Sequence, residues 1–152
     1  ALVSAPCAVH HPCMTSFALD DLQVVTTFAL FGLIWVVQLV QYPGLRLVPA
    51  QDFVRYHRHH CATIGWIVGP LMLGELAAAV GLLLRPAPAP AQPLIAGCVA
   101  LVWLSTFVLQ VPLHRRLSRG RDESALRRLV GTNWLRTAAW SAKAALVAGT
   151  MA

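Results

Sequence analysis

Two residues of opposite charge lie inside long apolar stretches of the chain. Glu75 is the one charged residue in the run 62–84, and Lys143 lies in a second, mostly apolar run, 129–150. A charged side chain at the centre of a bilayer costs about 3 kcal/mol on insertion scales, so such a residue needs a partner inside the protein. We therefore predict that Glu75 and Lys143 form a buried ion pair. In the alternative, Lys143 extends outward to the headgroups and Glu75 is protonated.

The run that contains Lys143 also carries a stripe of polar and aromatic residues. Its members are spaced i, i+3, i+7 and i+10, which places them on one face of a helix. They are Asn133, Arg136, Trp140 and Lys143. Arg136 could stabilise the negative oxygen of an enolate or phenolate, because a guanidinium is permanently charged and has several N–H donors.

Histidines gather where two apolar runs meet basic connections. His57 and Cys61 share a helix face at i+4, and so do Gln110 and His114 in the other half of the chain. His60 or His114 could act as a general acid or base, since histidine titrates near neutral pH. We expect these side chains to line a polar vestibule that leads to the level of the charge pair.

The sequence does not predict a specific metal or haem site. His57, His60 and His114 could ligate a metal ion or haem, and His57 and His60, at i+3, could share one ion. A histidine triple without a carboxylate motif is unspecific, so we predict no cofactor and keep ligation as an alternative. Four further residues could bind a metal ion, but nothing nearby would hold their short segment rigid: Cys7, His10, His11 and Cys13.

The elements that must position these residues are predicted to be transmembrane helices. Hydrophobic residues make up 57% of the 152 residues and charged residues 12%, which leaves too little polar surface for a soluble fold. A helix as long as the run 62–84 rises about 34 Å, enough to cross the roughly 30 Å hydrocarbon core. We predict an all-α integral membrane four-helix bundle, with spans at about 22–42, 62–84, 94–113 and 129–150.

The remaining segments are predicted to be a tail and connections. Residues 1–21 form a tail outside the cytoplasm, and we expect Met14 to be the natural start, with residues 1–13 an upstream extension. A helix at the membrane surface is expected to begin near Pro49 and to continue into the second span. Residues 85–93, RPAPAPAQP, are too rich in proline to form a helix.

The basic residues determine the expected orientation. Nine of the twelve Lys and Arg residues lie in the connections 45–61 and 114–128, and only Arg85 lies in the proline-rich connection. Basic connections stay in the cytoplasm, so both chain termini are predicted outside. These connections explain the net charge of +6, and no nucleic-acid partner is predicted. Three aromatic residues are expected at membrane interfaces: Tyr42, Trp66 and Trp134.

The two halves of the chain share a plan. In each half the first helix ends in Gln-x-Pro, with the prolines at Pro43 and Pro112, and a basic connection and a second helix follow. Glu75 follows Pro43 by 32 residues. Lys143 follows Pro112 by 31 residues, so the two charges fall at nearly equivalent positions. This plan predicts a parallel repeat with a pseudo-two-fold axis along the membrane normal.

Several strings of the sequence resemble those of small four-helix bacterial inner-membrane proteins with no assigned activity. They are WVVQLVQYPGL, FxxYHRxH leading into WIVGPLMLGEL, FVLQVPLHRRLSRGRD and LVGTNWLRTAAWSAKA, and they span nearly all of residues 22–148. Lys143 stands where the resemblance leads us to expect an arginine, which keeps the charge but not the bidentate geometry. The chain is more distantly similar to anthrone-oxygenase-like membrane proteins, which implies an oxidoreductase.

The spacing and the resemblance together give the candidate site. The catalytic candidates are His60, His114 and Arg136, and the ligand-binding candidates are Tyr56, Glu75, Gln110, Asn133, Trp134, Trp140 and Lys143. We expect the site to bind a small amphipathic ligand from the cytoplasmic leaflet of the lipid bilayer. One alternative is a membrane-embedded oxidoreductase that acts on a hydrophobic aromatic substrate. Another is a structural or assembly subunit, which could form a homo-oligomer.

Overall fold

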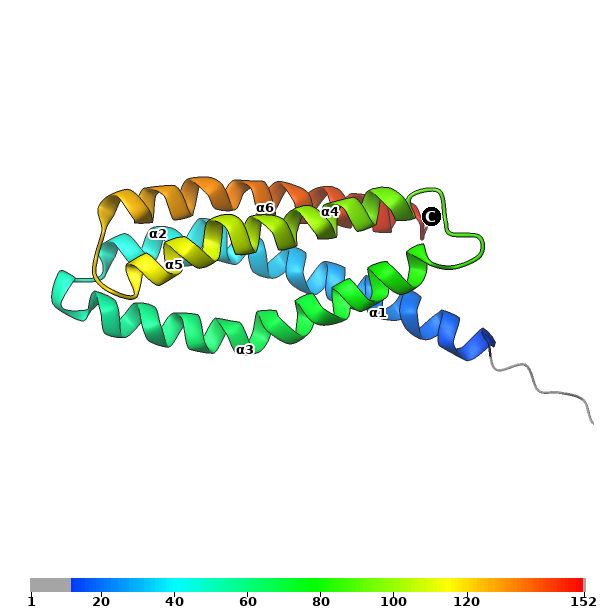
Figure 1. Ribbon diagram of the computed structural model, residues 1–152, viewed down its shortest axis with the longest axis horizontal. Helices are drawn as coiled ribbons and strands as arrows, with labels where there is room; N and C mark the ends of the chain where they lie inside the picture. Colours follow the sequence, from blue (N-terminus) through cyan, green and yellow to red (C-terminus); the bar gives the residue numbers. More distant parts are fainter. Residues whose placement is uncertain (1–11, 152) are drawn as a thin grey trace, which may run out of the picture.

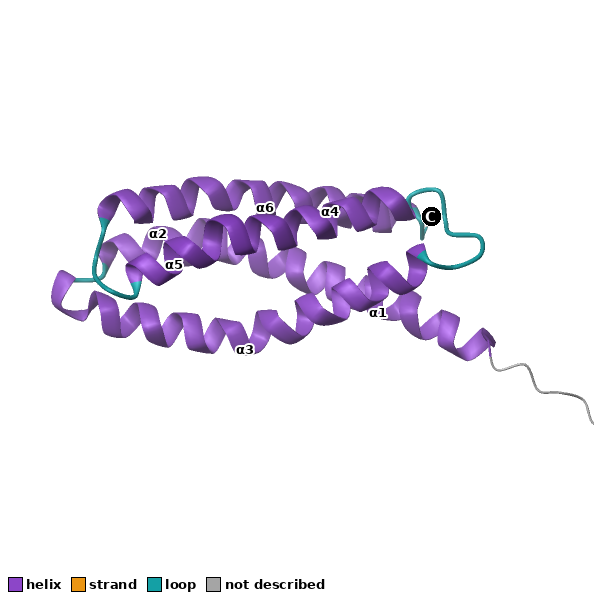
Figure 2. Ribbon diagram, in the orientation of Figure 1, coloured by secondary structure: helices purple, strands orange, loops and turns teal. Residues whose placement is uncertain are grey.

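The chain folds into four helical rods. The computed structural model describes residues 12–151, which form helices, turns and loops and no strand (Figures 1 and 2). The predicted all-α class is confirmed. The first rod consists of α1 (Pro12–Val36), the π-helical turn η1 (Val37–Gln41), α2 (Tyr42–Gly44) and the 3-10 turn η2 (Leu45–Leu47). The second rod is α3 (Ala50–Leu83), and the third consists of α4 (Gln92–Ser105), the π-helical turn η3 (Thr106–Gln110) and α5 (Val111–Leu117). The fourth rod is α6 (Glu123–Gly149).

The helices extend beyond the predicted spans. α1 begins at Pro12 rather than near residue 22, so residues 12–21 are helical where a tail was predicted. α3 begins directly after Pro49, whose backbone is extended, and continues to Leu83, so it covers the predicted second span except for its last residue, Leu84. The expectations for residues 1–11 lie outside the described part of the chain.

Each rod packs against two neighbours. α1 packs against α3 and α6, and α4 packs against the same two helices. The ring order is therefore α1, α3, α4, α6. The two arginine-rich connections lie at one end of the bundle, whereas the proline-rich connection and the C-terminus lie at the other (Figure 1). The four rods thus alternate in direction around a common axis.

Within residues 12–151, three segments are long and apolar enough to cross a membrane: Ala18–Leu47, Ala50–Leu83 and Gln92–Leu117. α6 has a similar length and forms over the predicted fourth span, but its polar stripe makes it less hydrophobic than these three. The stripe faces the inside of the bundle, and all four of its members are buried. The composition of α6 therefore reflects its central position rather than contact with water.

Polar and apolar residues are distributed in the reverse of the manner expected for a soluble bundle. Trp66 is 83% exposed, and Leu104 and Phe107 also project outward, whereas Thr27 and Gln38 are buried. A water-soluble protein places most of its amide and charged side chains on the surface. The observed arrangement suits a hydrocarbon environment, in which polar groups have to be satisfied inside the protein.

The two halves carry the same irregularity at equivalent positions. The π-helical turns η1 and η3 begin 69 residues apart, and each ends two residues before a proline, Pro43 or Pro112. Proline lacks an N–H and its ring collides with the carbonyl of residue i−4, and a wider turn relieves this conflict. Gln23 and Gln92, also 69 residues apart, donate hydrogen bonds to each other at 3.4 and 3.2 Å, as residues beside a two-fold axis would. Both features agree with the predicted repeat.

α1 and α3 approach each other closely at two glycines. A β-carbon at Gly81 would lie 2.9 Å from Leu19 Cδ1, and one at Gly74 would lie 3.3 Å from Thr26 Cγ2. Small residues at such contacts let helices pack tightly where no hydrophobic driving force brings them together, as in a membrane. This crossing holds α3 against α1 at the end of the bundle opposite the arginine-rich connections.

Candidate functional site

The predicted charge pair lies in the interior of the bundle. Lys143 Nζ is 2.7 Å from Glu75 Oε1, and neither residue is exposed. Trp140 Nε1 donates to the same carboxylate, at 3.0 Å to Oε1 and 3.2 Å to Oε2. An ammonium and an indole N–H therefore satisfy a carboxylate that would otherwise be unpaired in the interior, and the predicted ion pair is confirmed.

A second chain of polar contacts runs along α6 toward the basic end. Gln38 Nε2 donates to Val130 O at 3.3 Å, and Asn133 Nδ2 donates to Gln38 Oε1 at 2.8 Å. Arg136 Nη1 donates to Asn133 Oδ1 at 3.3 Å, and its guanidinium carbon lies 4.9 Å from the centre of the Trp140 ring. The cation–π contact and the hydrogen bond fix the position of the Arg136 side chain.

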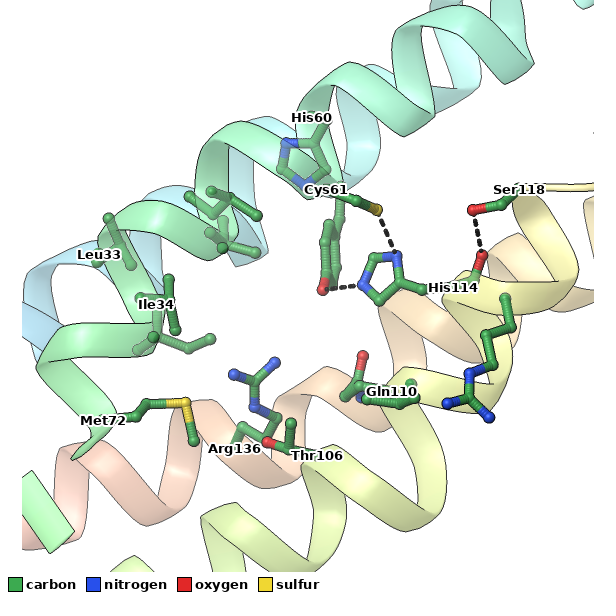
Figure 3. A pocket seen from close by; sticks show the side chains of 18 of the residues that line it. Leu33, Ile34, His60, Cys61, Met72, Thr106, Gln110, His114, Ser118 and Arg136 are labelled. Atoms are coloured by element: carbon green, nitrogen blue, oxygen red, sulfur yellow. Dashed lines mark hydrogen bonds between the residues drawn. The ribbon is translucent and has the colours of Figure 1, made fainter.

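Arg136 borders a cavity of about 630 Å³ to which all four rods contribute. Arg136, Gln110 and His114 project into the same space between α3 and the α4–α5 rod (Figure 3). Three arginines at the basic end, Arg58, Arg115 and Arg119, line its rim. The wall is otherwise largely apolar, with contributions from Leu33, Ile34, Val37, Ile64, Val68 and Met72.

Two polar atoms at this cavity have no partner in the protein. Arg136 Nε and Gln110 Oε1 are buried without a hydrogen bond, and Trp103 Nε1 is the third such atom among the described residues. Gln110 uses its other end, because Nε2 donates to Thr132 Oγ1 at 3.1 Å. Buried polar atoms are almost always hydrogen-bonded, so two residues that line one cavity each carry a polar atom that the protein leaves unsatisfied.

A cluster of ring nitrogens, hydroxyls and a thiol flanks the cavity at its basic end. His114 Nε2 lies 3.1 Å from the Tyr42 hydroxyl, and His114 Nδ1 lies 3.0 Å from His57 Nε2. Ser118 Oγ lies 3.3 Å from His57 Nδ1 and donates to His114 O at 2.9 Å. Cys61 Sγ lies 3.5 Å from His114 Nδ1 and 3.6 Å from His57 Nε2. Both histidines therefore direct one nitrogen to a hydroxyl and the other to a shared centre beside the thiol.

The candidate residues from the sequence divide into three groups. The cavity is lined by His60, Gln110, His114, Arg136 and Trp140. Glu75, Asn133 and Lys143 do not line the cavity but lie behind it. Glu75 accepts a hydrogen bond from Trp140, Asn133 accepts one from Arg136, and Lys143 donates one to Glu75. Tyr56 and Trp134 lie elsewhere: Tyr56 is 43% exposed and accepts from Gln41, and Trp134 is 47% exposed and packs edge-on against Trp35. Five of the ten candidate residues thus line the cavity, three lie behind it, and Tyr56 and Trp134 do neither.

Three site residues were not selected from the sequence. Tyr42 was expected at the membrane interface, but only 3% of it is exposed and its hydroxyl contacts His114. The π-helical turn before Tyr42 adds a residue to the helix and rotates the residues after it by about 100°. Cys61 was noted only for its spacing from His57, and Ser118 lay in a connection where only the arginines drew attention. The i, i+4 spacing places Cys61 beside His57 and Ser118 beside His114, but no pattern in the sequence brings the two pairs together.

Comparison with known proteins does not assign this site. No protein-family model, curated protein or solved structure matches the chain. The resemblances of the sequence strings to membrane-protein families stay expectations. The function therefore has to be argued from the cavity, its unpaired groups and the charges around it.

Proposed function

We propose that the protein is an integral protein of a bacterial inner membrane, with four spans, that binds a small amphipathic anion in the cavity beside Arg136. The observation that carries this proposal is that Arg136 and Gln110 line one apolar-walled cavity and that each keeps a buried polar atom, Nε or Oε1, without a partner. A volume of about 630 Å³ lies within the range of small-molecule sites. The bound molecule would place its polar end at these two groups and its apolar body against the aliphatic wall.

The charge balance in the interior favours an anion. Glu75 is already paired with Lys143, and Arg136 forms no ion pair among the described residues. One positive charge is therefore left over in a region where an unpaired charge is costly. A carboxylate or phenolate at Arg136 would neutralise it, and a hydroxyl on the same molecule would donate to Gln110 Oε1.

The exposed apolar surface supports placement of all four rods in the membrane. Because α6 turns Arg136 and Lys143 inward and packs between α1 and α4, it can cross the bilayer with its neighbours. The arginine-rich connections share one end, which the positive-inside rule places in the cytoplasm. The rim arginines would then attract anions from the cytoplasmic side. A C-terminal alkaline phosphatase fusion should be active and a C-terminal fluorescent-protein fusion dark, and the opposite result would contradict this orientation.

Ligand binding can be tested with 4-hydroxy-1-naphthoate, which combines an aromatic body, a carboxylate and a hydroxyl. Titration into detergent-purified protein should quench tryptophan fluorescence with saturation, because Trp140 lies at the cavity. Arg136→Gln should weaken binding by about 10- to 100-fold, the effect of losing a hydrogen bond to a charged group. 1-Naphthoate, which lacks the hydroxyl, should bind the wild type more weakly than 4-hydroxy-1-naphthoate does. Its affinity for Gln110→Met should equal its affinity for the wild type.

Arg128→Gln provides the matched control, because Arg128 is an exposed arginine on the same helix. It should leave the affinity for the naphthoate unchanged. Circular dichroism and size-exclusion chromatography should show that both variants retain the fold. Quenching without saturation, or equal affinity in Arg136→Gln and Arg128→Gln, would show simple partition into the micelle and contradict the proposal.

A second function is favoured by the histidines at the same cavity. His60 and His114 both line it, near the guanidinium that would hold a phenolate oxygen. These positions suit an oxidoreductase that acts on a hydrophobic aromatic molecule, with one histidine as general acid or base. Oxygen uptake with anthrone that is lost in His60→Gln, while the naphthoate still binds, would favour an enzyme over a binding protein.

A further inference from the structure

We propose that His57, Cys61 and His114 bind a late first-row transition-metal ion, with Zn²⁺ or copper as the matching class. Their candidate ligand atoms all lie within 4.8 Å of one another. The inference is independent of the anion site at Arg136, because it rests on three other side chains and on their mutual distances.

The spacing of the three atoms matches the edges of a metal-centred tetrahedron. With Zn–N near 2.05 Å and Zn–S near 2.3 Å, tetrahedral angles place two nitrogens about 3.3 Å apart and each nitrogen about 3.6 Å from the sulfur. The observed separations are 3.0 Å between His57 Nε2 and His114 Nδ1, and 3.6 and 3.5 Å from these atoms to Cys61 Sγ. A single ion can therefore reach all three atoms with small side-chain adjustments.

The outer nitrogens of both histidines are held as metal ligands require. The hydroxyl of Ser118 donates to His114 O, so its oxygen is left to accept from His57 Nδ1–H. This fixes the tautomer in which His57 Nε2 carries a lone pair toward the shared centre. The Tyr42 oxygen can accept from His114 Nε2–H in the same way and free Nδ1. Such outer hydrogen bonds orient the ring and raise the basicity of a metal-bound histidine.

Hydrogen bonding alone accounts for these contacts less completely. A proton on His114 Nδ1 would satisfy His57 Nε2, in a relay from Tyr42 to Ser118. That relay gives no role to Cys61, whose sulfur lies almost equidistant from both inner nitrogens. A metal ion uses all three atoms at once, and the thiolate supplies negative charge that offsets the ion.

The ligand set selects the class of ion. One thiolate and two imidazoles suit Zn²⁺ and copper, whereas Mg²⁺ and Ca²⁺ require oxygen ligands. Three protein ligands leave a fourth position, and both Cys61 and His114 line the cavity. The open position can therefore take water or an oxygen atom of a molecule in the cavity.

The test uses the full chain with a tag that contains no histidine. The other donors predicted from the sequence are removed by Cys7→Ser, His10→Ala, His11→Ala and Cys13→Ser. After dialysis against a chelator, the protein should take up one Zn²⁺ per chain. Co²⁺ in its place should give tetrahedral d–d bands and a sulfur-to-cobalt charge-transfer band. Cu²⁺ should give an intense visible thiolate-to-copper band if copper is the better match.

Matched variants separate the site from its surroundings. Cys61→Ser should abolish the sulfur charge-transfer band and weaken Zn²⁺ binding at least about 100-fold, whereas Cys98→Ser, a free cysteine on α4, should change neither. His57→Ala should weaken binding similarly, and His59→Ala, its exposed near neighbour, should not. Ser118→Ala should cost about 10-fold while the sulfur band remains.

Three results would overturn the proposal. They are no stoichiometric uptake of Zn²⁺ or copper, a Co²⁺ spectrum without the sulfur band, or Zn²⁺ affinity that is equal in Cys61→Ser and Cys98→Ser. In each case the cluster would be the hydrogen-bonded relay alone. Because the naphthoate titration uses different groups, failure of metal binding would leave the anion site standing, and the reverse also holds.

Discussion

Two polar regions lie along the inner face of α6, and they differ in how their buried groups are satisfied. Around Glu75, an ammonium and an indole N–H occupy the carboxylate. Around Arg136, two turns before Lys143, a donor and the nearby Gln110 acceptor remain unpaired at a cavity. Trp140 belongs to both regions, because its N–H contacts Glu75 and its ring contacts Arg136.

The difference separates a structural role from a binding role. A buried ion pair whose carboxylate is hydrogen-bonded through both oxygens fixes how helices fit together. Buried groups without partners cost stability, and they persist where a bound molecule completes them. The pair at Glu75 therefore joins α3 to α6, and the region at Arg136 is the one at which we propose that a ligand binds.

The largest expected effect comes from breaking the ion pair in the region around Glu75, which we call the closed region because its carboxylate is paired. Lys143→Met removes the partner of Glu75 and leaves a buried carboxylate that only Trp140 contacts. Breaking a buried pair in this way costs about 3–5 kcal/mol in the free energy of unfolding. Unfolding of detergent-solubilised protein by increasing fractions of SDS, followed by circular dichroism, would measure it.

The control for this prediction replaces both partners. Glu75→Leu combined with Lys143→Met removes both charges, and such apolar replacements are often neutral or stabilising. The exchange Glu75→Lys with Lys143→Glu should also recover part of the loss caused by either single change. If the double variants are no more stable than Lys143→Met, the two charges do not depend on each other.

An intermediate effect is expected from two buried glutamines that differ in how completely their side-chain amides are hydrogen-bonded. Gln92 donates to Gln23 and to Ala79 O, so Gln92→Met leaves buried groups without partners and should cost about 1–3 kcal/mol. Gln110 makes one hydrogen bond and leaves its oxygen unpaired, so Gln110→Met should change the free energy of unfolding by less than about 1 kcal/mol. The same SDS titration compares them, and a larger loss at Gln110 would contradict the distinction between the regions.

The sequence was sufficient to predict the closed region. Charges inside apolar runs are costly, so Glu75 and Lys143 had to find a partner, and the Gln-x-Pro repeat placed them at equivalent depths. The face of α6 followed from simple helical spacing. These inferences used only hydropathy, charge and the 3.6-residue period, which act within one helix or through the repeat.

The region around Arg136, which we call the open region because it borders the cavity, could be predicted only in part. The cavity depends on how far α3 stands from the α4–α5 rod, and no local pattern encodes that separation. The phase of Tyr42 depends on the π-helical turn, which shifts the helical period without a change in composition. Tyr56 and Trp134 do not line this cavity for a related reason, because residues at helix ends and interfaces can face either the lipid or the interior.

The smallest expected effect lies outside both regions, where α6 begins in water. The Ser124 hydroxyl and the Ala125 backbone amide both donate hydrogen bonds to the Asp122 carboxylate, and Arg116 forms an ion pair with it. The hydrogen bond from Ser124, the one from Ala125 and the charge of Arg116 lower the pKa of Asp122 to about 2. Because this pKa lies below the unfolded value of about 3.9, the stabilisation is complete only above about pH 5 and is lost as the pH falls to about 2. Hydrogen exchange of the first turn of α6, corrected for intrinsic rates, should therefore accelerate between about pH 5 and pH 2. Asp122→Asn keeps an N-cap acceptor but cannot titrate, so it should remove this pH dependence, and its persistence in Asp122→Asn would assign it to another group.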